Sequence, residues 1–209
     1  SDLFLHGIQN ATIDDGARPI TTVRSSTIGL IGTAPEADPF IFPLNKPVLI
    51  AGSRTLAAKL GETGTLPQAL DSIFDQIGAV VIVVRINEEI AAPATLANVI
   101  GGVDANTGTY EGVHAFLASE NITGFVPKIL IAPGFTHTRT EAVGETPATS
   151  NPVVAELIGI AERLKAVIVA DGPNTNDADA IAYSEDFGSK RVFLVDPKVL
   201  KSVAGETSQ

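Results

Sequence analysis

The sequence predicts an α/β fold: a layered, largely parallel sheet with helices on its faces, preceded by an extended N-terminal arm. Two observations indicate this fold. β-branched segments alternate with segments of helical periodicity along most of the chain, which favours right-handed strand–helix–strand crossovers. Residues 79–84 are apolar at every position, as in a strand that is covered on both faces. The first 24 residues show neither pattern.

The predicted arm covers residues 1–24. Its apolar residues are scattered among glycine, asparagine, aspartate and proline without a helical period, and an Asp-Gly pair at 15–16 is typical of a turn. We therefore expect an extended segment at 1–24 and an α/β domain over residues 25–209.

The first half of that domain starts with two short strands, at 27–31 and 48–51. Ser53 is placed to cap a helix that ends at Gly61, and Thr65 with Gln68 forms a capping-box pattern before a helix that ends at Gly78. The apolar strand at 79–85 comes next. Two further helices are predicted at about 94–100 and 109–119.

The second half repeats the alternation. Strands are predicted at 128–132, 166–170 and 191–195, with helices at about 152–164 and 176–187 between them. Ser150 or Asn151 can cap the first of these helices, and Pro152 suits its first turn. The Thr-rich segment 135–149 is predicted to be a surface loop. The chain ends with a strand-like Val199-Leu200 and a polar tail, which is typical of a cut chain.

Composition excludes several classes of function. The chain has 24 acidic and 14 basic residues and would repel nucleic acid and anionic lipid. It has no cysteine, which excludes disulfides, thiolate catalysis and the commonest zinc sites. Neither a signal peptide nor a membrane span is apparent in the sequence. We therefore expect no nucleic acid partner and no membrane.

Ligands of parallel sheets bind beyond the carboxyl ends of the strands. The residues expected there are Arg85, Asn87, Pro133, Gly134, residues 171–176 and Asp196. The run Asp171-Gly-Pro-Asn-Thr-Asn176 could hold a metal or a ribose hydroxyl, with a phosphate at the following helix N-terminus. The same residue types are preferred in tight turns and as helix caps, and we favour that interpretation.

No other motif predicts catalysis or a cofactor. Residues 29–34 resemble a dinucleotide loop only faintly, because the third glycine is missing and Pro35 follows instead of a helix. No Walker-type Gly-Lys-Ser/Thr occurs. The histidines, His6, His114 and His137, have no partners at metal-ligand spacing. Residue chemistry alone leaves the function undetermined.

Several segments nevertheless resemble one protein family, the contractile tail sheath proteins of P2-like phages and R-type pyocins. The matching segments follow one another from residue 6 to residue 197, and they are His6-Gly-Ile, Asp15-Gly-Ala-Arg-Pro-Ile20, Ser26-Thr-Ile-Gly-Leu30, Asn45-Lys-Pro-Val-Leu49, Val99-Ile-Gly-Gly-Val103, Ile131-Ala-Pro-Gly134, Ala170-Asp-Gly-Pro-Asn174, Phe187-Gly-Ser-Lys-Arg191 and Val195-Asp-Pro197.

The resemblance implies a structural protein of the virion tail, not an enzyme, and no cofactor. Such a subunit polymerises with other sheath subunits around the tail tube protein, meets baseplate and terminator proteins, and contracts to drive the tube through the host envelope. Its N-terminal arm is shared between neighbours by strand addition. On this chain the arm contacts would come from six residues, Leu3, Leu5, Ile8, Ile13, Arg18 and Ile20.

Sheath proteins continue into a C-terminal domain that this sequence lacks, so the 25–209 domain is expected to be incomplete. Two alternatives remain open. One is a flavodoxin-like enzyme or nucleotide-binding domain that uses the loops at Asp171 and Asp196. The other is a small-molecule receptor or receiver-like module.

Overall fold

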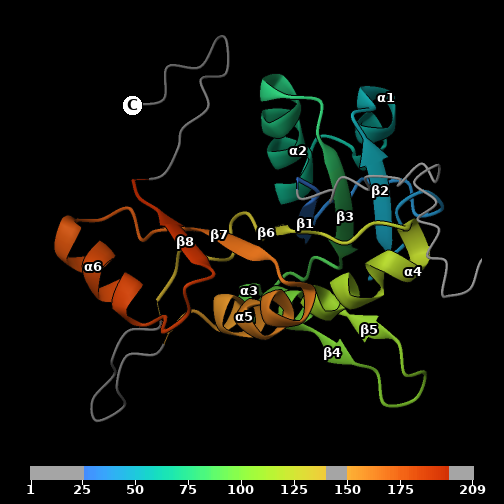
Figure 1. Ribbon diagram of the computed structural model, residues 1–209. Coiled ribbons are helices and arrows are strands. Elements are labelled where there is room, and N and C mark those ends of the chain that lie inside the picture. Colours follow the sequence, from blue (N-terminus) through green and yellow to red (C-terminus); the bar gives the residue numbers. More distant parts are fainter. Residues whose placement is uncertain (1–25, 140–149, 198–209) are drawn as a thin grey trace, which may run out of the picture.

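A computed structural model describes residues 26–139 and 150–197 (Figure 1). The predicted arm at 1–24 with its six interface residues, positions 140–149 of the Thr-rich loop and the Val199-Leu200 segment lie outside the described residues.

The centre of the molecule is a six-stranded sheet. Its strand order is β2 (Pro47–Ala51), β3 (Val80–Ile86), β1 (Ile28–Thr33), β6 (Ile129–Ile131), β7 (Val167–Asp171) and β8 (Val192–Val195). Every neighbouring pair is parallel except β2 and β3, so the prediction of a largely parallel α/β sheet is confirmed. The parallel strands follow the doubly wound order of flavodoxin-like sheets.

Helices lie on both faces of this sheet. On one side are α1 (Arg54–Ala57), the short 3-10 helix Ala58–Leu60 and α2 (Thr65–Gln76). On the other side are α3 (Ala92–Ile100), a 3-10 helix at Gly112–Ala118 and α5 (Pro152–Leu164). Figure 1 shows α2 above the sheet and α5 and α3 below it, while α6 (Asp177–Glu185) lies beyond β8. The short α4 (Ser119–Thr123) follows the second 3-10 helix.

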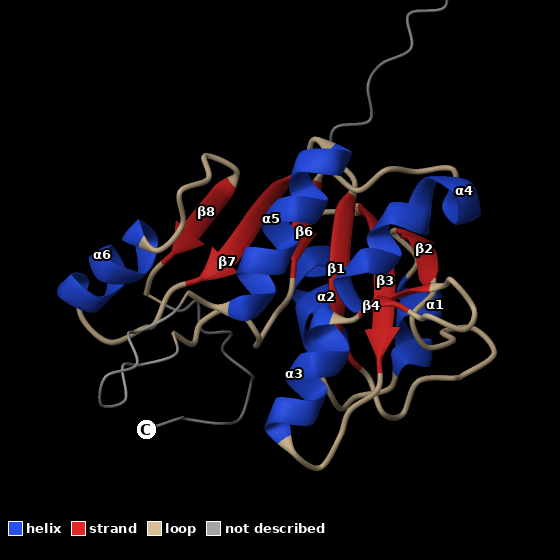
Figure 2. Ribbon diagram, turned by 90° about the horizontal axis from the view of Figure 1, so that it is seen from below, coloured by secondary structure: helices blue, strands red, loops and turns tan. Residues whose placement is uncertain are grey.

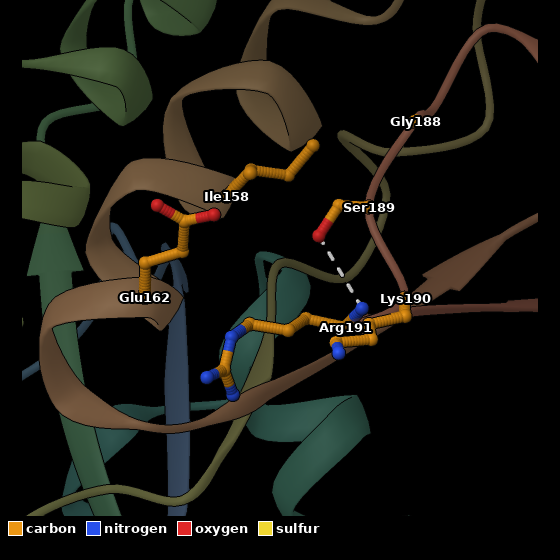
Figure 3. A pocket seen from close by; sticks show the side chains of 6 residues that line it. All are labelled: Ile158, Glu162, Gly188, Ser189, Lys190 and Arg191. Atoms are coloured by element: carbon orange, nitrogen blue, oxygen red, sulfur yellow. Dashed lines mark hydrogen bonds between the residues drawn. The ribbon is translucent and has the colours of Figure 1, made fainter.

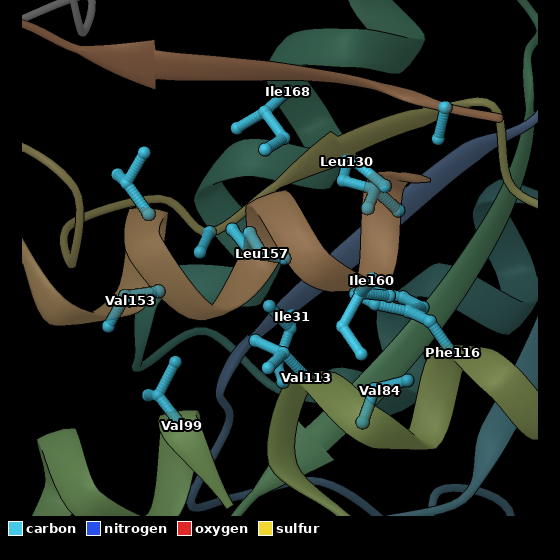
Figure 4. Packing of buried hydrophobic residues seen from close by; sticks show 14 of the residues in the cluster. Ile31, Val84, Val99, Val113, Phe116, Leu130, Val153, Leu157, Ile160 and Ile168 are labelled. Atoms are coloured by element: carbon cyan, nitrogen blue, oxygen red, sulfur yellow. The ribbon is translucent and has the colours of Figure 1, made fainter. Parts of the chain in front are cut away.

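Alternating residues of the strands pack into two separate hydrophobic cores, one on each face of the sheet. Leu30, Val81 and Val83 point to the α2 side, where they pack with Leu66 and Leu70. Their neighbours in the strands point to the α5 side and build a larger cluster there, shown in Figure 4, which includes Ile31, Val84, Phe116, Leu130, Leu157, Ile160 and Ile168. Burial on both faces accounts for the continuous apolar sequence of β3.

Two predicted caps are confirmed. Asn151 caps α5 by accepting hydrogen bonds from two backbone amides, and Ser53 Oγ accepts one from Leu56 at 3.3 Å. The capping box at Thr65 is wrong. Gly64 occupies the N-cap position, and the Thr65 side chain bonds to Thr33 on β1 instead.

The helix predicted at 109–119 starts later than predicted, at residue 112, and is a 3-10 helix. The chain first closes a small hairpin, β4 (Gly102–Val103) with β5 (Tyr110–Glu111), and then forms the 3-10 helix at 112–118. Gly101 and Gly112, both with positive φ, pack their backbones so closely that neither position has room for a side chain. This contact between the ends of α3 and β5 overrides the helical periodicity of the sequence.

Among the described residues, one part of the sheet has no helix layer over it. On the α2 side, no described helix lies over β7 and β8 (Figure 1). Ile168 and Ala170 of β7 are buried on the α5 side, whereas Val169 on the opposite side is only half-buried. Beside it on β8, Phe193 is 55% exposed and Val195 39% exposed. We call these three residues the open face.

Candidate functional site

A flavodoxin-like strand order places the candidate ligand crevice between the carboxyl ends of β1 and β6. These strands are neighbours in the sheet, but the chain leaves them in opposite directions, and this is where such sheets bind their ligands. The helix N-terminus at the end of β1 is that of α2, and helix N-termini bind anions where they are accessible.

That crevice is filled by the protein itself. The backbone amide of Thr33 donates to Thr65 Oγ1 at 3.1 Å, and the amide of Thr65 donates back to Thr33 Oγ1 at 3.3 Å. A Cβ atom on Gly32 would collide with the Thr65 hydroxyl, and one on Gly64 would collide with the Thr33 carbonyl. The N-terminus of α2 is therefore packed directly on the end of β1, where a phosphate would have to enter.

The carboxyl end of β6 is occupied in the same way. Asn151 Nδ2 donates to the carbonyls of Phe135 and Thr138 at 3.0 and 2.8 Å, while its Oδ1 caps α5. The buried Tyr183 hydroxyl donates to the Thr136 carbonyl, and Thr136 Oγ1 accepts from the Asp171 amide at 3.0 Å. The loop after β6 is thus held by α5, α6 and β7 together.

Tyr183 is the most perturbed group in this cluster. Burial raises the pKa of its phenol, and the nearby carboxylates of Asp186 and Asp171 raise it further, so the group stays neutral. Asp186 itself pairs with Arg139 through two contacts, of 2.6 and 2.7 Å. These interactions fix the loop after β6 to α6 and occupy the Tyr183 hydroxyl and the Asp186 carboxylate.

Of the interpretation favoured for the run from Asp171 to Asn176, the helix cap is confirmed. The tight turn at Asp171-Gly172 is wrong, because Asp171 is the last residue of β7 and the Gly172 amide donates to the Val195 carbonyl at 2.8 Å. Asn176 Oδ1 accepts from the Asp179 amide at 3.0 Å at the start of α6. Asp196 Oδ1 accepts from the Asn174 amide at 2.8 Å, and the same carboxylate lies against the bare Cα of Gly172. The Asp196 carboxylate therefore belongs to a local loop structure.

The other sequence candidates do not converge. Burial lowers the pKa of Arg85, whose Nε donates to the Phe42 carbonyl at 2.7 Å and holds the loop before β2. Asn87 Nδ2 donates to Glu89 at 2.6 Å, and His114 Nε2 lies 2.9 Å from a carboxylate oxygen of Glu156.

His137 is exposed, and His6 lies outside the described residues. Within residues 26–139 and 150–197, no group of three His, Cys, Asp or Glu could hold a metal ion, and no helix has the length and apolar character that a membrane span requires.

An open depression of about 610 Å³ does occur, at the other end of the sheet. It lies between the end of α5 and the loop before β8 (Figure 3), and it is lined by Ile158, Glu162, Gly188, Ser189, Lys190 and Arg191. Sequence reasoning missed it because it directed attention to the carboxyl ends of the strands. Its signal was the basic pair Lys190-Arg191 immediately before a strand.

Comparisons with known proteins agree among themselves. A sequence model of the tail sheath protein Gp18 domain III N-terminal region matches residues 25–86. A putative prophage major tail sheath protein of Pseudomonas aeruginosa (strain UCBPP-PA14) is 36% identical over 94% of this chain and 47% of its own length.

Two phage proteins are similar to the same extent. The tail sheath protein of Escherichia phage P2 is 34% identical over 94% of this chain and 48% of its own length. The major tail sheath protein of Serratia phage KSP20 is 34% identical over 100% of this chain and 51% of its own length. The chain spans about half the length of these relatives.

Proposed function

Because this chain is a homologue of phage tail sheath proteins, as its motifs indicated, we propose that it is a structural subunit of a contractile tail sheath in a virion tail. The similarity to proteins of that name over 94% or more of the chain is the observation that carries the proposal. The relatives are structural tail sheath proteins, not enzymes.

In this proposal the subunits assemble with one another around a tail tube protein, in the cytoplasm of a host bacterium. The sheath meets baseplate and terminator proteins at its ends, and its contraction drives the tube through the host envelope. The described structure supports a mechanical role, because its strand ends are closed by internal hydrogen bonds and a rigid body of this kind can be repacked as a unit.

The division of the chain is part of the same proposal. Residues 25–209 form the α/β body, and residues 1–24 form an arm whose contacts with a neighbouring subunit come from Leu3, Leu5, Ile8, Ile13, Arg18 and Ile20. Main-chain hydrogen bonds of an added strand would give the connection strength, while alternate apolar side chains would fix its register.

Negative-stain electron microscopy of the protein alone, and then with a tail tube protein, tests the main proposal. We expect regular hollow tubes or sleeves. A protein that stays monomeric under both conditions contradicts the sheath role.

The arm is tested in the same assay. Aspartate at Leu3, Leu5 and Ile8 is expected to abolish assembly, because three apolar contacts are replaced by charges. The matched control is Gln9→Asp, Asn10→Asp and Thr12→Asp, which adds the same three negative charges at polar positions of the same segment and should leave assembly intact. Equal effects of the two sets would contradict the arm contacts.

The strand order is the one observation that favours the flavodoxin-like alternative. A nucleotide- or flavin-binding domain would melt at a higher temperature with its ligand present. We expect no shift with flavin mononucleotide or ATP, because the Thr33–Thr65 contacts fill the crevice. A saturable shift of several degrees would restore the alternative.

A further inference from the structure

The half of the sheet that contains β6, β7 and β8 has charges of opposite sign at its two ends. These strands are parallel, so residues that precede them lie at one end and residues that follow them at the other. Figure 2 shows the arrowheads of β7 and β8 pointing to the end where α6 lies.

The end before the strands is basic. Arg163 and Lys165 at the end of α5, and Lys190 just before β8, are exposed side chains. Lys190 and its neighbour Arg191 line the open depression, together with the single acid Glu162 (Figure 3). We call Arg163, Lys165 and Lys190 the basic end.

The opposite end is acidic. Asp177, Asp179 and Asp196 are exposed, and Asp171 is half-buried beside them. No lysine or arginine occurs anywhere from residue 171 to residue 187. Within the described parts of the chain, no ion pair within 4 Å involves any of these four carboxylates or the three residues of the basic end. We call the four carboxylates the acidic end.

Helix dipoles stabilise the acidic residues at the start of α6 and the basic residue at the end of α5. Asp177 and Asp179 lie in the first turn of α6, and Arg163 lies in the last turn of α5. The two ends do not neutralise each other inside one molecule. A strand of this length spans about 16 Å, which is about twice the Debye length of roughly 8 Å at physiological salt.

We propose that copies of this chain associate head to tail, with the basic end of one copy against the acidic end of the next. Two different surfaces of one chain that complement each other make a heterologous contact, and repeated heterologous contacts produce open helical assemblies instead of closed dimers. Complementary charge also lets molecules with a net charge of −10 approach each other in one orientation. The inference rests on the proposed sheath function and assigns it a contact surface.

Two charge-reversed variants test the contact. Arg163→Glu with Lys190→Glu gives a chain with two acidic ends, and Asp177→Lys with Asp196→Lys gives a chain with two basic ends. Lys46→Glu with Lys59→Glu is the matched control, because both lysines are exposed on the β2 side of the molecule and the change in net charge equals that of the first variant. Melting curves establish that each variant is folded. If the glutamates of the first variant prevent folding, Arg163→Gln with Lys190→Gln takes its place.

Sedimentation velocity gives the readout. Association of the wild-type chain should weaken as salt rises from about 0.01 M to about 1 M, over which the Debye length falls from roughly 30 Å to roughly 3 Å. Each reversed variant alone should associate more weakly than wild type, by up to about thirtyfold, because it loses two exposed ion pairs of up to about 1 kcal/mol each. An equimolar mixture of the two should recover association, and the control should match wild type.

The head-to-tail contact is overturned if either reversed variant alone associates as strongly as the wild-type chain. It is also overturned if the equimolar mixture of the two variants does not associate. Those results would leave the sheath function standing if wild-type protein still forms tubes. A wild-type chain that remains monomeric at every salt concentration and forms no tubes overturns both.

Discussion

Replacing Asn151 with alanine should cost more stability than the loss of an ordinary helix cap. Asn151 is fully buried and uses both ends of its amide. Its Oδ1 accepts from the amides of Val153 and Val154 at 2.9 and 3.1 Å, and its Nδ2 donates to the carbonyls of Phe135 and Thr138. Loss of the cap costs about 1 kcal/mol. Loss of the two amide donors, with a small cavity, adds about 2 kcal/mol.

Asn176 provides a matched control, because it caps α6 through one bond to the Asp179 amide at an exposed site. Asn176→Ala should therefore cost only about 1 kcal/mol. Asn151→Asp keeps the capping oxygen but turns a carboxylate oxygen toward the Phe135 and Thr138 carbonyls, so it should also be destabilising.

Urea unfolding followed by circular dichroism gives the free energy of unfolding of each variant. We expect about 3 kcal/mol of destabilisation for Asn151→Ala, with Asn151→Asp no more stable than wild type. Equal costs for the alanine variants at 151 and 176 would refute the reasoning that the Asn151 amide connects the loop after β6 to α5.

Three further predictions concern strain and pH. Gly64→Ala should lower the free energy of unfolding in urea by about 3 kcal/mol, because φ at Gly64 is +98° and the new Cβ would collide with the Thr33 carbonyl. The control is Gly78→Ala, which has open space around it and should change the free energy of unfolding by less than about 1 kcal/mol. The pKa of Tyr183 is raised in the folded state, so the contribution of this group to stability is complete below its unfolded-state pKa of about 10 and is lost as pH rises above that value. The melting temperature should therefore fall in alkali, and it should fall less for Tyr183→Phe. Backbone hydrogen bonds lower the pKa of Asp104, so its support of the β4–β5 hairpin is present above about pH 4 and is lost as pH falls. The protection factors of the hairpin amides, corrected for the intrinsic pH dependence of exchange, should therefore fall in acid, and Asp104→Asn should remove that pH dependence.

The sequence predicts those parts of the fold that depend on local patterns. The helix at 152–164 was expected with its cap and its first-turn proline, because Asn151 and Pro152 act on the backbone next to them. The continuous apolar run of β3 indicated a strand covered on both faces, and the neighbouring parallel strands agree.

The errors occur where distant backbone contacts decide the structure. Thr65 has a capping sequence, but its hydroxyl is taken by Thr33, thirty-two residues away. The 109–119 segment has helical spacing, but the contact of Gly101 with Gly112 sets a hairpin and a 3-10 helix. The basic depression before β8 needs the end of α5 as its second wall, so the Lys190-Arg191 pair in the sequence indicated basic residues but not a depression.

The open face at Val169, Phe193 and Val195 makes the stability of this chain depend on its surroundings. A parallel sheet is normally shielded from water on both sides, and here no described helix covers this side of β7 and β8. Any surface that covers these side chains binds the folded state and not the unfolded one, so it raises the apparent free energy of unfolding by mass action. The measured melting temperature then depends on protein concentration and on the binding partners present, as well as on the sequence. Comparisons between variants therefore hold only at one fixed concentration.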